Sequence, residues 1–432
     1  MDTGIAGEGP SARRIDLVEH GPWTDVRLAP DAGRALADSG IVDARPDPYS
    51  ARTGTTWQVR GLGKVGAIRL GGVEVHIAPK LPVRRLFFLL GYAADPVKHW
   101  RDDTEGVEVG AEPELLPALA AAFVRQAERA LRQGLLQGYR TTDSALTVVR
   151  GRIREGDQIR RRFGVPLPVE VTYDEFTTDI AENRLLLAAT TRLLRLPGVP
   201  RPVHLGLSRL RARLADVSVL PPGHRLPVWR PSRLNTRYQA ALRLAGLILR
   251  EFSAEQGGAG TRLDGFVLDL AAVFEDFVCA SLSRALRAYG GRSVAQARHH
   301  LDEAGGILMK PDLVWYDDAG RPLGVVDAKY KAERREGFPG SDLYQMLAYC
   351  TVLGLPQGHL VYAKGNEPRQ QHAVRGSGTI LTQHALDLDQ SPDSVVRSMS
   401  VIAAAVAGKP SRPPGMFEGT AGRTGTAIRT DR

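Results

Sequence analysis

The sequence has little cysteine and no long apolar run. Its 432 residues include only two cysteines, Cys279 and Cys350, too few for a disulfide framework or a cysteine-rich zinc site, and this scarcity is typical of a reducing compartment. No apolar run approaches the ~18 residues that a membrane helix needs. The first residues also lack the basic and apolar segments of a signal peptide. We therefore expect a cytoplasmic protein that is neither exported nor membrane-spanning.

Lysine is scarce as well. Lys and Arg together number 57, but only eight of these residues are lysines. Because arginine serves wherever a positive charge is enough, the remaining lysines mark places where a compact, titratable amine is needed. Three of the eight, Lys310, Lys329 and Lys331, fall close together. This segment is therefore the first place to look for chemistry.

The overall composition is that of a globular protein with a basic bias. Hydrophobic residues make up 43% and charged residues 24% of the chain, which excludes a mostly disordered or fibrous protein. The formal net charge of +9 favours an acidic partner such as nucleic acid. The length is typical of two or three domains.

Local patterns divide the chain into five segments. Residues 65–70 and 73–77 alternate apolar and polar residues around Gly71 and Gly72, which predicts a β-hairpin. Apolar residues at helical spacing predict a helix over 114–136. After residue 268, strands alternate with helices, which predicts a sheet with helices on its faces. The expected segments are a disordered arm (1–20), a β-containing N-terminal region (21–110), a helical partner-docking region (111–233), an α/β domain (234–408) and a disordered tail (409–432).

Two acids and a lysine form the strongest candidate site. Asp327 and Lys329 are two residues apart at the end of an apolar strand, so their side chains project from the same face. If the preceding turn is centred between residues 319 and 320, Asp312 lies directly opposite Asp327. Like charges in that position are destabilising. The pattern therefore predicts a divalent cation between them, and oxygen ligands favour Mg²⁺ or Mn²⁺.

Such a site suits hydrolysis of a phosphodiester. The metal would stabilise charge and lower the pKa of a bound water, while Lys329 orients the water or the phosphate. Glu275, on the preceding helix, is a candidate third carboxylate, directly or through water. Gln345 and Tyr349 are four residues apart, hence on one helical face, and are candidates to steady the lysine or the DNA backbone.

The order of these residues resembles a nuclease superfamily. A Glu, then Pro-Asp, Asp-x-Lys and Gln-x-x-x-Tyr resembles the PD-(D/E)xK nucleases, and residues 326–331 and 343–349 resemble McrC, the nuclease subunit of the McrBC modification-dependent restriction system. Residues 150–153, 178–184 and 234–238 are also similar to McrC segments, so the resemblance covers roughly residues 80–365. It implies a C-terminal PD-(D/E)xK restriction-endonuclease-like domain, a mixed sheet flanked by helices. The implied metal ligands are Asp312, Asp327, the backbone carbonyl of Ala328 and, more variably, Glu275.

The resemblance also implies a partner. McrB is an AAA+ GTPase that recognises methylated cytosine and forms a ring, to which McrC docks, stimulating nucleotide hydrolysis and cutting DNA in phage defence. Residues 61–65 lack the upstream glycine and the Ser or Thr of a phosphate-binding loop, so we expect the motor on another chain. Two alternatives stay open: a stand-alone repair or recombination nuclease, and an inactive nuclease-fold adaptor that binds DNA or an AAA+ ring.

Two further groups of residues have open roles. Asp179 is expected to cap a helix, with Asn183 and Arg184 in a structural network or in contact with the partner. A basic segment is expected either to contact DNA phosphates or the partner ring, or to be a solvated surface. Its residues are Arg150, Arg152, Arg154, Arg160 and Arg161.

Overall fold

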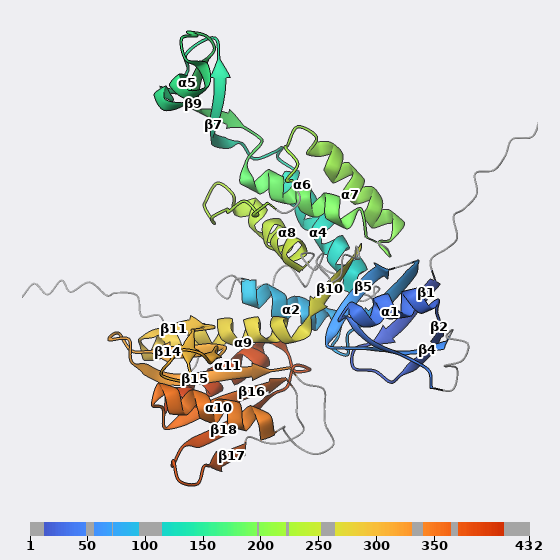
Figure 1. Ribbon diagram of the computed structural model, residues 1–432, viewed down its shortest axis with the longest axis vertical. Helices are drawn as coiled ribbons and strands as arrows, with labels where there is room; N and C mark the ends of the chain where they lie inside the picture. Colours follow the sequence, from blue (N-terminus) through green and yellow to red (C-terminus); the bar gives the residue numbers. More distant parts are fainter. Residues whose placement is uncertain are drawn as a thin grey trace, which may run out of the picture. The chain divides into compact units, whose positions relative to one another are not determined.

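The protein is described by a computed structural model with two compact units (Figure 1). The described residues are 13–48, 56–70, 72–94, 115–196, 198–221, 224–251, 264–330, 340–363 and 370–409. The first unit lies within residues 1–84 and 101–270, and the second within 85–100 and 271–432. Within the described residues, no helix combines the length and the apolar character needed to cross a membrane.

The first unit begins with a four-stranded sheet of order β1-β6-β5-β10. The predicted hairpin is confirmed as β5 (Lys64–Leu70) and β6 (Val73–Ala78), which pair antiparallel. The expectation of a disordered arm over 1–20 is wrong for its second half, because β1 (Arg13–Val18) pairs in parallel with β6. Ile15 and Leu17 are buried, and this burial holds the strand in place. Residues 1–12 lie outside the described residues.

A smaller sheet and a short helix complete the N-terminal part. The sheet has the order β2-β4-β3, from Thr24–Arg27, Thr56–Gly61 and Val42–Pro46. Helix α1 (Pro30–Asp38) buries Leu36. Gly33 permits the close approach of this helix to the sheet, since a Cβ there would lie 2.0 Å from the ring of Trp57.

Four helices and a projecting β-arm form the rest of the first unit. Helices α4 (Leu115–Leu131) and α6 (Ala181–Leu193) bury leucine and alanine side chains against α7 (Arg201–Arg213) and α8 (Gln239–Glu251). Residues 111–233 were expected to be helical, but β7 (Gly138–Leu146), β8 (Arg152–Ile153) and β9 (Val169–Thr177) form a sheet with α5 (Glu155–Arg162) at its end. We call residues 138–177 the arm. Its strands consist largely of polar residues that are at least partly exposed, so they lack the apolar periodicity that predicts a buried strand.

The second unit is a six-stranded mixed sheet with helices on both faces. Its order is β11-β14-β15-β16-β18-β17, from Arg292–Ala295, Leu313–Tyr316, Pro322–Lys329, Gln357–Ala363, Ile380–Leu386 and Gln370–Ala373. The pairs β15–β16 and β16–β18 are parallel, and the other pairs are antiparallel. A two-stranded ribbon, β12 (His299–His300) and β13 (Leu308–Met309), precedes β14.

Successive residues of β15 face different helices. Val325 belongs to the apolar cluster with Met346 of α10 (Gly340–Leu353), whereas Gly324 faces Val406 of α11 (Pro392–Val406). Gly358 on β16 permits close packing of α10, since a Cβ there would lie 2.6 Å from the Cys350 Sγ atom. The sheet-and-helix layers predicted from the sequence are therefore present.

The boundary between the units differs from the predicted one. The α/β domain was expected to begin at residue 234, but α8 packs on α6, and β10 (Asp264–Asp269) pairs with β5 of the first unit. The main segment of the second unit instead begins at residue 271, at the start of α9 (Leu270–Leu286), and the unit also includes most of α2 (Val83–Ala94). The ring of Phe88 in α2 lies 5.6 Å from that of Phe277 in α9. Of the expected tail over 409–432, residues 410–432 lie outside the described residues.

Candidate active site

The two aspartates meet at the open end of the β14–β15 pair. Leu313 pairs with Val326, so the same register continued by one residue sets Asp312 opposite Asp327, as the sequence predicted. A bulge between Trp315 and Tyr316 shifts the pairing only near the turn. The backbone N–H of Ala328 donates to Asp312 Oδ2 at 2.7 Å. This contact holds the first carboxylate against the strand that carries the second.

A chain of polar contacts runs from Asp327 to helix α10. Asp327 is only 2% exposed, and its Oδ2 atom lies 2.5 Å from the Lys329 ammonium. Lys329 Nζ donates to Gln345 Oε1 at 3.0 Å, and Gln345 Nε2 donates to the Tyr349 hydroxyl at 2.9 Å. The structure therefore brings Asp312, Asp327, Lys329, Gln345 and Tyr349 together in one region of the second unit.

Burial and mutual repulsion perturb the pKa values of the acids. Burial, together with the charge of Asp327, raises the pKa of Asp312 to about 8, against the opposing effects of the Ala328 N–H and the Lys329 charge. Burial also raises the pKa of Asp327, although Lys329 opposes it. Burial and the two aspartate charges raise the pKa of Tyr349 to about 12. The site therefore disfavours two simultaneous negative charges on the paired aspartates.

Lys329 has a raised pKa despite its burial. Burial lowers the pKa of an amine, but attraction to Asp327 and Asp312 outweighs that effect here. The side chain consequently remains an ammonium at neutral pH. It can donate hydrogen bonds and attract phosphate oxygens, but it does not act as a base.

Glu275 is not grouped with the two aspartates. Its Oε1 atom accepts a hydrogen bond from Gln296 Nε2 at 2.5 Å, and among the described residues no three His, Cys, Asp or Glu side chains form a metal-binding cluster. Its charge still contributes to raising the pKa of Asp312. The side chain therefore acts on the site at longer range, which leaves the predicted route through a water in place as a hypothesis.

Sequence reasoning missed two residues that hold the backbone of Asp312. The carbonyl oxygen of Asp312 accepts from the Gln296 N–H at 2.9 Å and from Cys279 Sγ at 3.3 Å. Gln296 has a positive φ of 49°, which turns the chain after β11 so that its amide also reaches Glu275. Neither residue carries a local signal, since both are more than a dozen positions from Asp312 in the sequence.

The donor set is compatible with a hard divalent cation. Asp327 Oδ2 is buried and makes no hydrogen bond of regular geometry among the described residues, and its Lys329 contact is an ion pair. Two facing carboxylates with excess negative charge provide oxygen ligands alone, the kind that Mg²⁺ and Mn²⁺ take, usually with several waters. Asp312 and Asp327 would be the side-chain ligands.

The predicted basic segment lies on the arm, where several of its arginines have acidic neighbours. Arg154 and Arg160 both pair with Asp157, and Arg161 lies 4.0 Å from Glu170. The Arg150 guanidinium lies over the ring of Tyr173, 4.8 Å from its centroid. Arg152 is exposed on β8. The charge of this segment is thus largely balanced within the arm.

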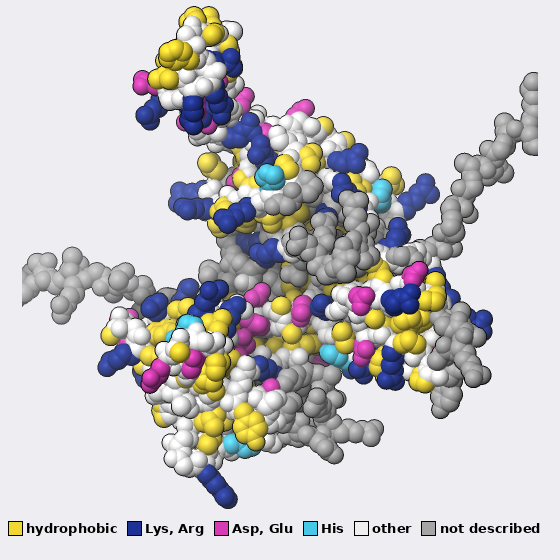
Figure 2. All heavy atoms as spheres, viewed as in Figure 1, with side chains coloured by type: hydrophobic (Ala, Val, Ile, Leu, Met, Phe, Trp, Pro, Cys, Tyr) yellow, Lys and Arg dark blue, Asp and Glu magenta, His cyan; other side chains and the backbone are white. Residues whose placement is uncertain are grey.

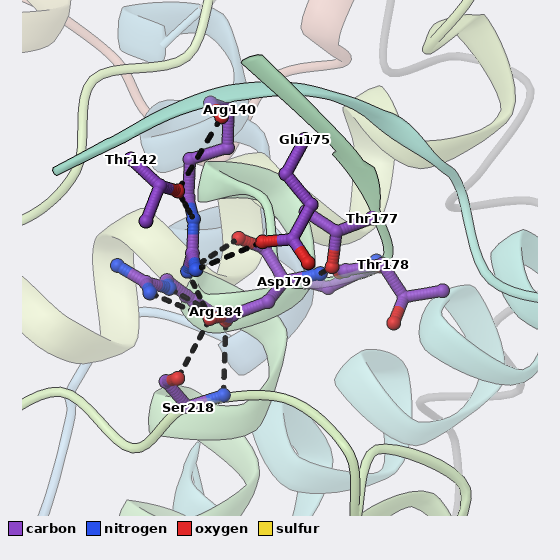
Figure 3. A network of polar contacts seen from close by, with 9 residues as sticks. Arg140, Thr142, Glu175, Thr177, Thr178, Asp179, Arg184 and Ser218 are labelled. Atoms are coloured by element: carbon purple, nitrogen blue, oxygen red, sulfur yellow. Dashed lines mark hydrogen bonds and ion pairs between the residues drawn. The ribbon is translucent and has the colours of Figure 1, made fainter. Parts of the chain in front are cut away.

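Asp179 anchors the base of the arm and is not the helix cap that the sequence predicted. The N-cap of α6 is Ile180, without a side-chain cap. Asp179 instead accepts hydrogen bonds from Arg184 at 2.7 Å to each oxygen, from Ser218 N at 2.9 Å and Oγ at 2.6 Å, and from Arg140 of β7 (Figure 3). The hydrogen bonds from Arg184 hold the pKa of the Asp179 carboxyl well below its ordinary range, against the effect of burial. The structural network is therefore the role that these contacts favour.

The fold and site together define a two-unit α/β protein with a buried carboxylate–lysine site. Residues 59–363 match the family described as McrBC 5-methylcytosine restriction system component, and this match covers more than half of the chain. The chain belongs to this family.

Two solved structures are similar to the chain. One is a chain of the refined half-complex from the tetradecameric assembly of Thermococcus gammatolerans McrB AAA+ hexamers with bound McrC. It is 17% identical, covers 90% of this chain and 100% of its own length, and has a TM-score of 0.53. The other, from the cryo-EM structure of the Thermococcus gammatolerans McrBC complex, is 18% identical, covers 63% and 88%, and has a TM-score of 0.37. No curated relative matches the chain. The first of these similarities concerns the fold alone.

Proposed function

We propose that the protein is a Mg²⁺- or Mn²⁺-dependent DNA endonuclease. In this proposal it is the McrC-like subunit of a 5-methylcytosine-specific restriction complex, and it acts with and stimulates an McrB-like AAA+ GTPase. The observation that carries the proposal is the convergence of Asp312, Asp327 and Lys329 at the end of one strand pair, in a chain of the McrBC family. The second unit would then be its PD-(D/E)xK domain.

Each side chain has a role in this proposal. Asp312 and Asp327 hold the cation, with the carbonyl of Ala328 and the more distant Glu275 as the remaining candidate ligands. The cation supplies charge stabilisation and an activated water when it is bound. Lys329 orients the scissile phosphate or that water. Gln345 holds the Lys329 ammonium, and Tyr349 fixes the amide of Gln345.

The partner is part of the proposal. The similar chain in Thermococcus gammatolerans comes from an assembly of McrB AAA+ hexamers with bound McrC, and this chain has no phosphate-binding loop of its own. The arm exposes several large apolar side chains, which is typical of a protein-contact surface. They are Val148, Val149, Ile153, Ile159, Phe163, Val165 and Leu167.

Substitutions at the site test whether the chain catalyses cleavage. Asp327→Asn and Lys329→Ala should each lower Mg²⁺-dependent cleavage of methylated DNA by about 10²-fold or more, because each removes a charge from the reacting centre. Cleavage is measured with the purified chain and its neighbouring AAA+ protein, and restriction of methylated plasmids is measured in cells. Matched controls are Asp318→Asn and Lys310→Ala, both exposed in the second unit.

The outcomes separate the three functions that the sequence left open. Unchanged restriction by both site variants at wild-type protein levels would reject catalysis and leave the inactive adaptor. Cleavage by the wild-type chain without the AAA+ protein would instead support the stand-alone nuclease.

A further inference from the structure

One exposed loop carries positive charge and contains no acidic residue. From residue 217 to residue 250 the sequence contains no Asp or Glu. Within this stretch, residues 224–234 form an irregular segment between α7 and α8, which we call the basic loop. Its arginines, Arg225, Arg230 and Arg233, are all exposed. Figure 2 shows Lys and Arg side chains gathered over the region of α6 and α8.

The basic loop differs from the arm in how its charges are compensated. Among the residues that the structure describes, none of its three guanidinium groups lies within ion-pair distance of a carboxylate, whereas Arg154 and Arg160 of the arm both pair with Asp157. The carboxylate of Glu182 on α6 accepts a hydrogen bond from the Asn235 amide at 3.0 Å. The positive potential of the loop is therefore available to an anionic partner.

Buried polar groups hold the loop in place. Asn235 is 3% exposed, its Oδ1 atom accepts from Ser232 N at 2.9 Å, and its Nδ2 atom donates to the Arg230 carbonyl at 2.8 Å. Gln239 Nε2 donates to the Ser232 carbonyl at 3.2 Å. These contacts fix the backbone on both sides of Pro231, so Arg230 and Arg233 start from a restrained backbone. Restraint of this kind lowers the entropy lost on binding.

We propose that the basic loop contacts the phosphate backbone of the DNA that the enzyme cuts. The proposal rests on the proposed function for the identity of the substrate, and it assigns the main DNA contact to Arg225, Arg230 and Arg233 in place of the arginines of the arm. Val228 and Leu234, which are 84% and 82% exposed, offer apolar area for the sugars between the phosphates. Nucleic acid suits this loop better than a protein, because all the charges that the loop itself carries have one sign and the Glu182 carboxylate beside it accepts a hydrogen bond from Asn235.

The salt dependence of DNA binding tests this assignment. The full chain is titrated with a short duplex in EDTA, which prevents cleavage, at a series of KCl concentrations. The logarithm of the binding constant falls as log salt rises, and each phosphate contact contributes about 0.9 to the magnitude of this slope. The combined variant Arg225→Gln, Arg230→Gln and Arg233→Gln should lower that slope by about 2 to 3.

A variant with the same change in net charge is the control. Arg14→Gln, Arg34→Gln and Arg209→Gln remove three guanidiniums that pair with Asp16, Asp31 and Glu128. This control should keep the wild-type slope within about 0.5, because its arginines do not contact the phosphates. Thermal unfolding of both variants should match the wild type, since every substituted side chain is exposed.

Three results would overturn the proposal. One is an unchanged slope in the loop variant, and another is no measurable duplex binding by the wild-type chain at low salt. The third is loss of partner-stimulated GTP hydrolysis with unchanged DNA binding, which would assign the loop to the AAA+ ring. Failure of the proposed function would give a different result. The loop variant would still have the lower slope, but the wild-type chain would cleave no DNA in the presence of the partner and Mg²⁺.

Discussion

At the scale of single residues, repulsion between two neighbouring carboxylates destabilises the candidate site. Asp327 is buried and Asp312 opposite it is half-buried, and the Lys329 ammonium contacts both Asp327 and Gln345 of the helix. Such an arrangement costs stability in the absence of a cation, because two carboxylates shielded from water repel each other. Functional sites commonly carry a cost of this kind. The energetic signature of the site is therefore measurable without any assay of activity.

The raised pKa of Asp312 makes stability fall as pH rises. The pKa is about 8 in the folded protein and 3.8 ordinarily, so between these values the folded state holds a proton that the unfolded state has released. The stabilising contribution is complete below pH 3.8 and is lost as pH rises through about 8. Asp312→Asn should remove this pH dependence. At pH 8 in EDTA its free energy of unfolding should be about 1 kcal/mol higher than that of the wild type.

Denaturant unfolding at pH 5 and pH 8 measures this effect. Asp318→Asn, an exposed position in the turn of the same hairpin, is the control and should follow the wild type. Added Mg²⁺ should stabilise the wild type at pH 8 but not Asp312→Asn, because ligand binding to the folded state raises its stability. A wild type that is equally stable at both pH values would contradict the paired-carboxylate geometry.

At the scale of elements, Asp179 ties three segments together. It accepts from Arg140 of β7, from Arg184 of α6 and from Ser218 after α7, so it connects the arm to the helices. The segment around Asn235 makes a second connection, to Glu182 of α6. Two of the segments that resemble McrC, 178–184 and 234–238, thus share a structural role: they hold the bases of the arm and the basic loop.

Removing the Asp179 carboxylate should destabilise the first unit. Asp179→Ala leaves the Arg184 guanidinium, which is 27% exposed, without this partner, and breaking a partly buried pair in this way costs up to about 3 kcal/mol. Because the pKa of Asp179 is lowered, its contribution is present above the ordinary value of 3.8 and is lost as pH falls below it. The free energy of unfolding in urea at pH 7 and pH 3 measures both effects.

Asp174→Ala is the matched control for this prediction. Asp174 lies on β9 of the arm, is exposed, and accepts from Thr141 Oγ1 at 2.7 Å. Its loss should change stability by less than about 0.5 kcal/mol, as expected at a surface position. Equal effects of the two substitutions would show that the Asp179 network contributes nothing special.

At the scale of the whole molecule, the apolar surface of the arm makes the chain suited to assembly. Phe163 is 85% exposed and Ile159 is 63% exposed, and neither contributes to a core. If the proposed AAA+ partner binds here, Phe163→Asp combined with Ile159→Asp should abolish co-elution with it and its stimulated GTP hydrolysis, because a charge in an apolar interface is costly. Stability should not change. Co-purification and a GTPase assay provide the measurement.

Val401→Asp controls for the addition of a charge to an exposed apolar position. Val401 lies on α11 of the second unit and is 56% exposed. The control should bind the partner normally. Normal partner binding by the arm variant would show that the AAA+ contact lies elsewhere on the chain.

Much of the second unit was predictable from local sequence. Buried strands and the helix after them follow from apolar spacing, and the strand period alone sets Asp327 and Lys329 on one face. The hairpin register that sets Asp312 opposite Asp327 depends on the position of the turn and also on the bulge between Trp315 and Tyr316, which shifts the pairing by one residue. Neighbours in the sequence determine all of these features.

Contacts between distant residues decided the rest. Two contacts join segments that no local pattern relates: the parallel pairing of β1 with β6 and the hydrogen bond between Glu275 and Gln296. The unit boundary at residue 271 likewise depends on contacts between distant segments. Asp179 resembles a helix cap in sequence because Asp is a good cap, but in the fold its carboxylate accepts a hydrogen bond from Ser218, 39 residues away. The sequence by itself determined which residues can carry chemistry, and tertiary packing decided which of them meet. The reason is that strand and helix periods act over a few residues, whereas burial and charge compensation depend on the whole fold.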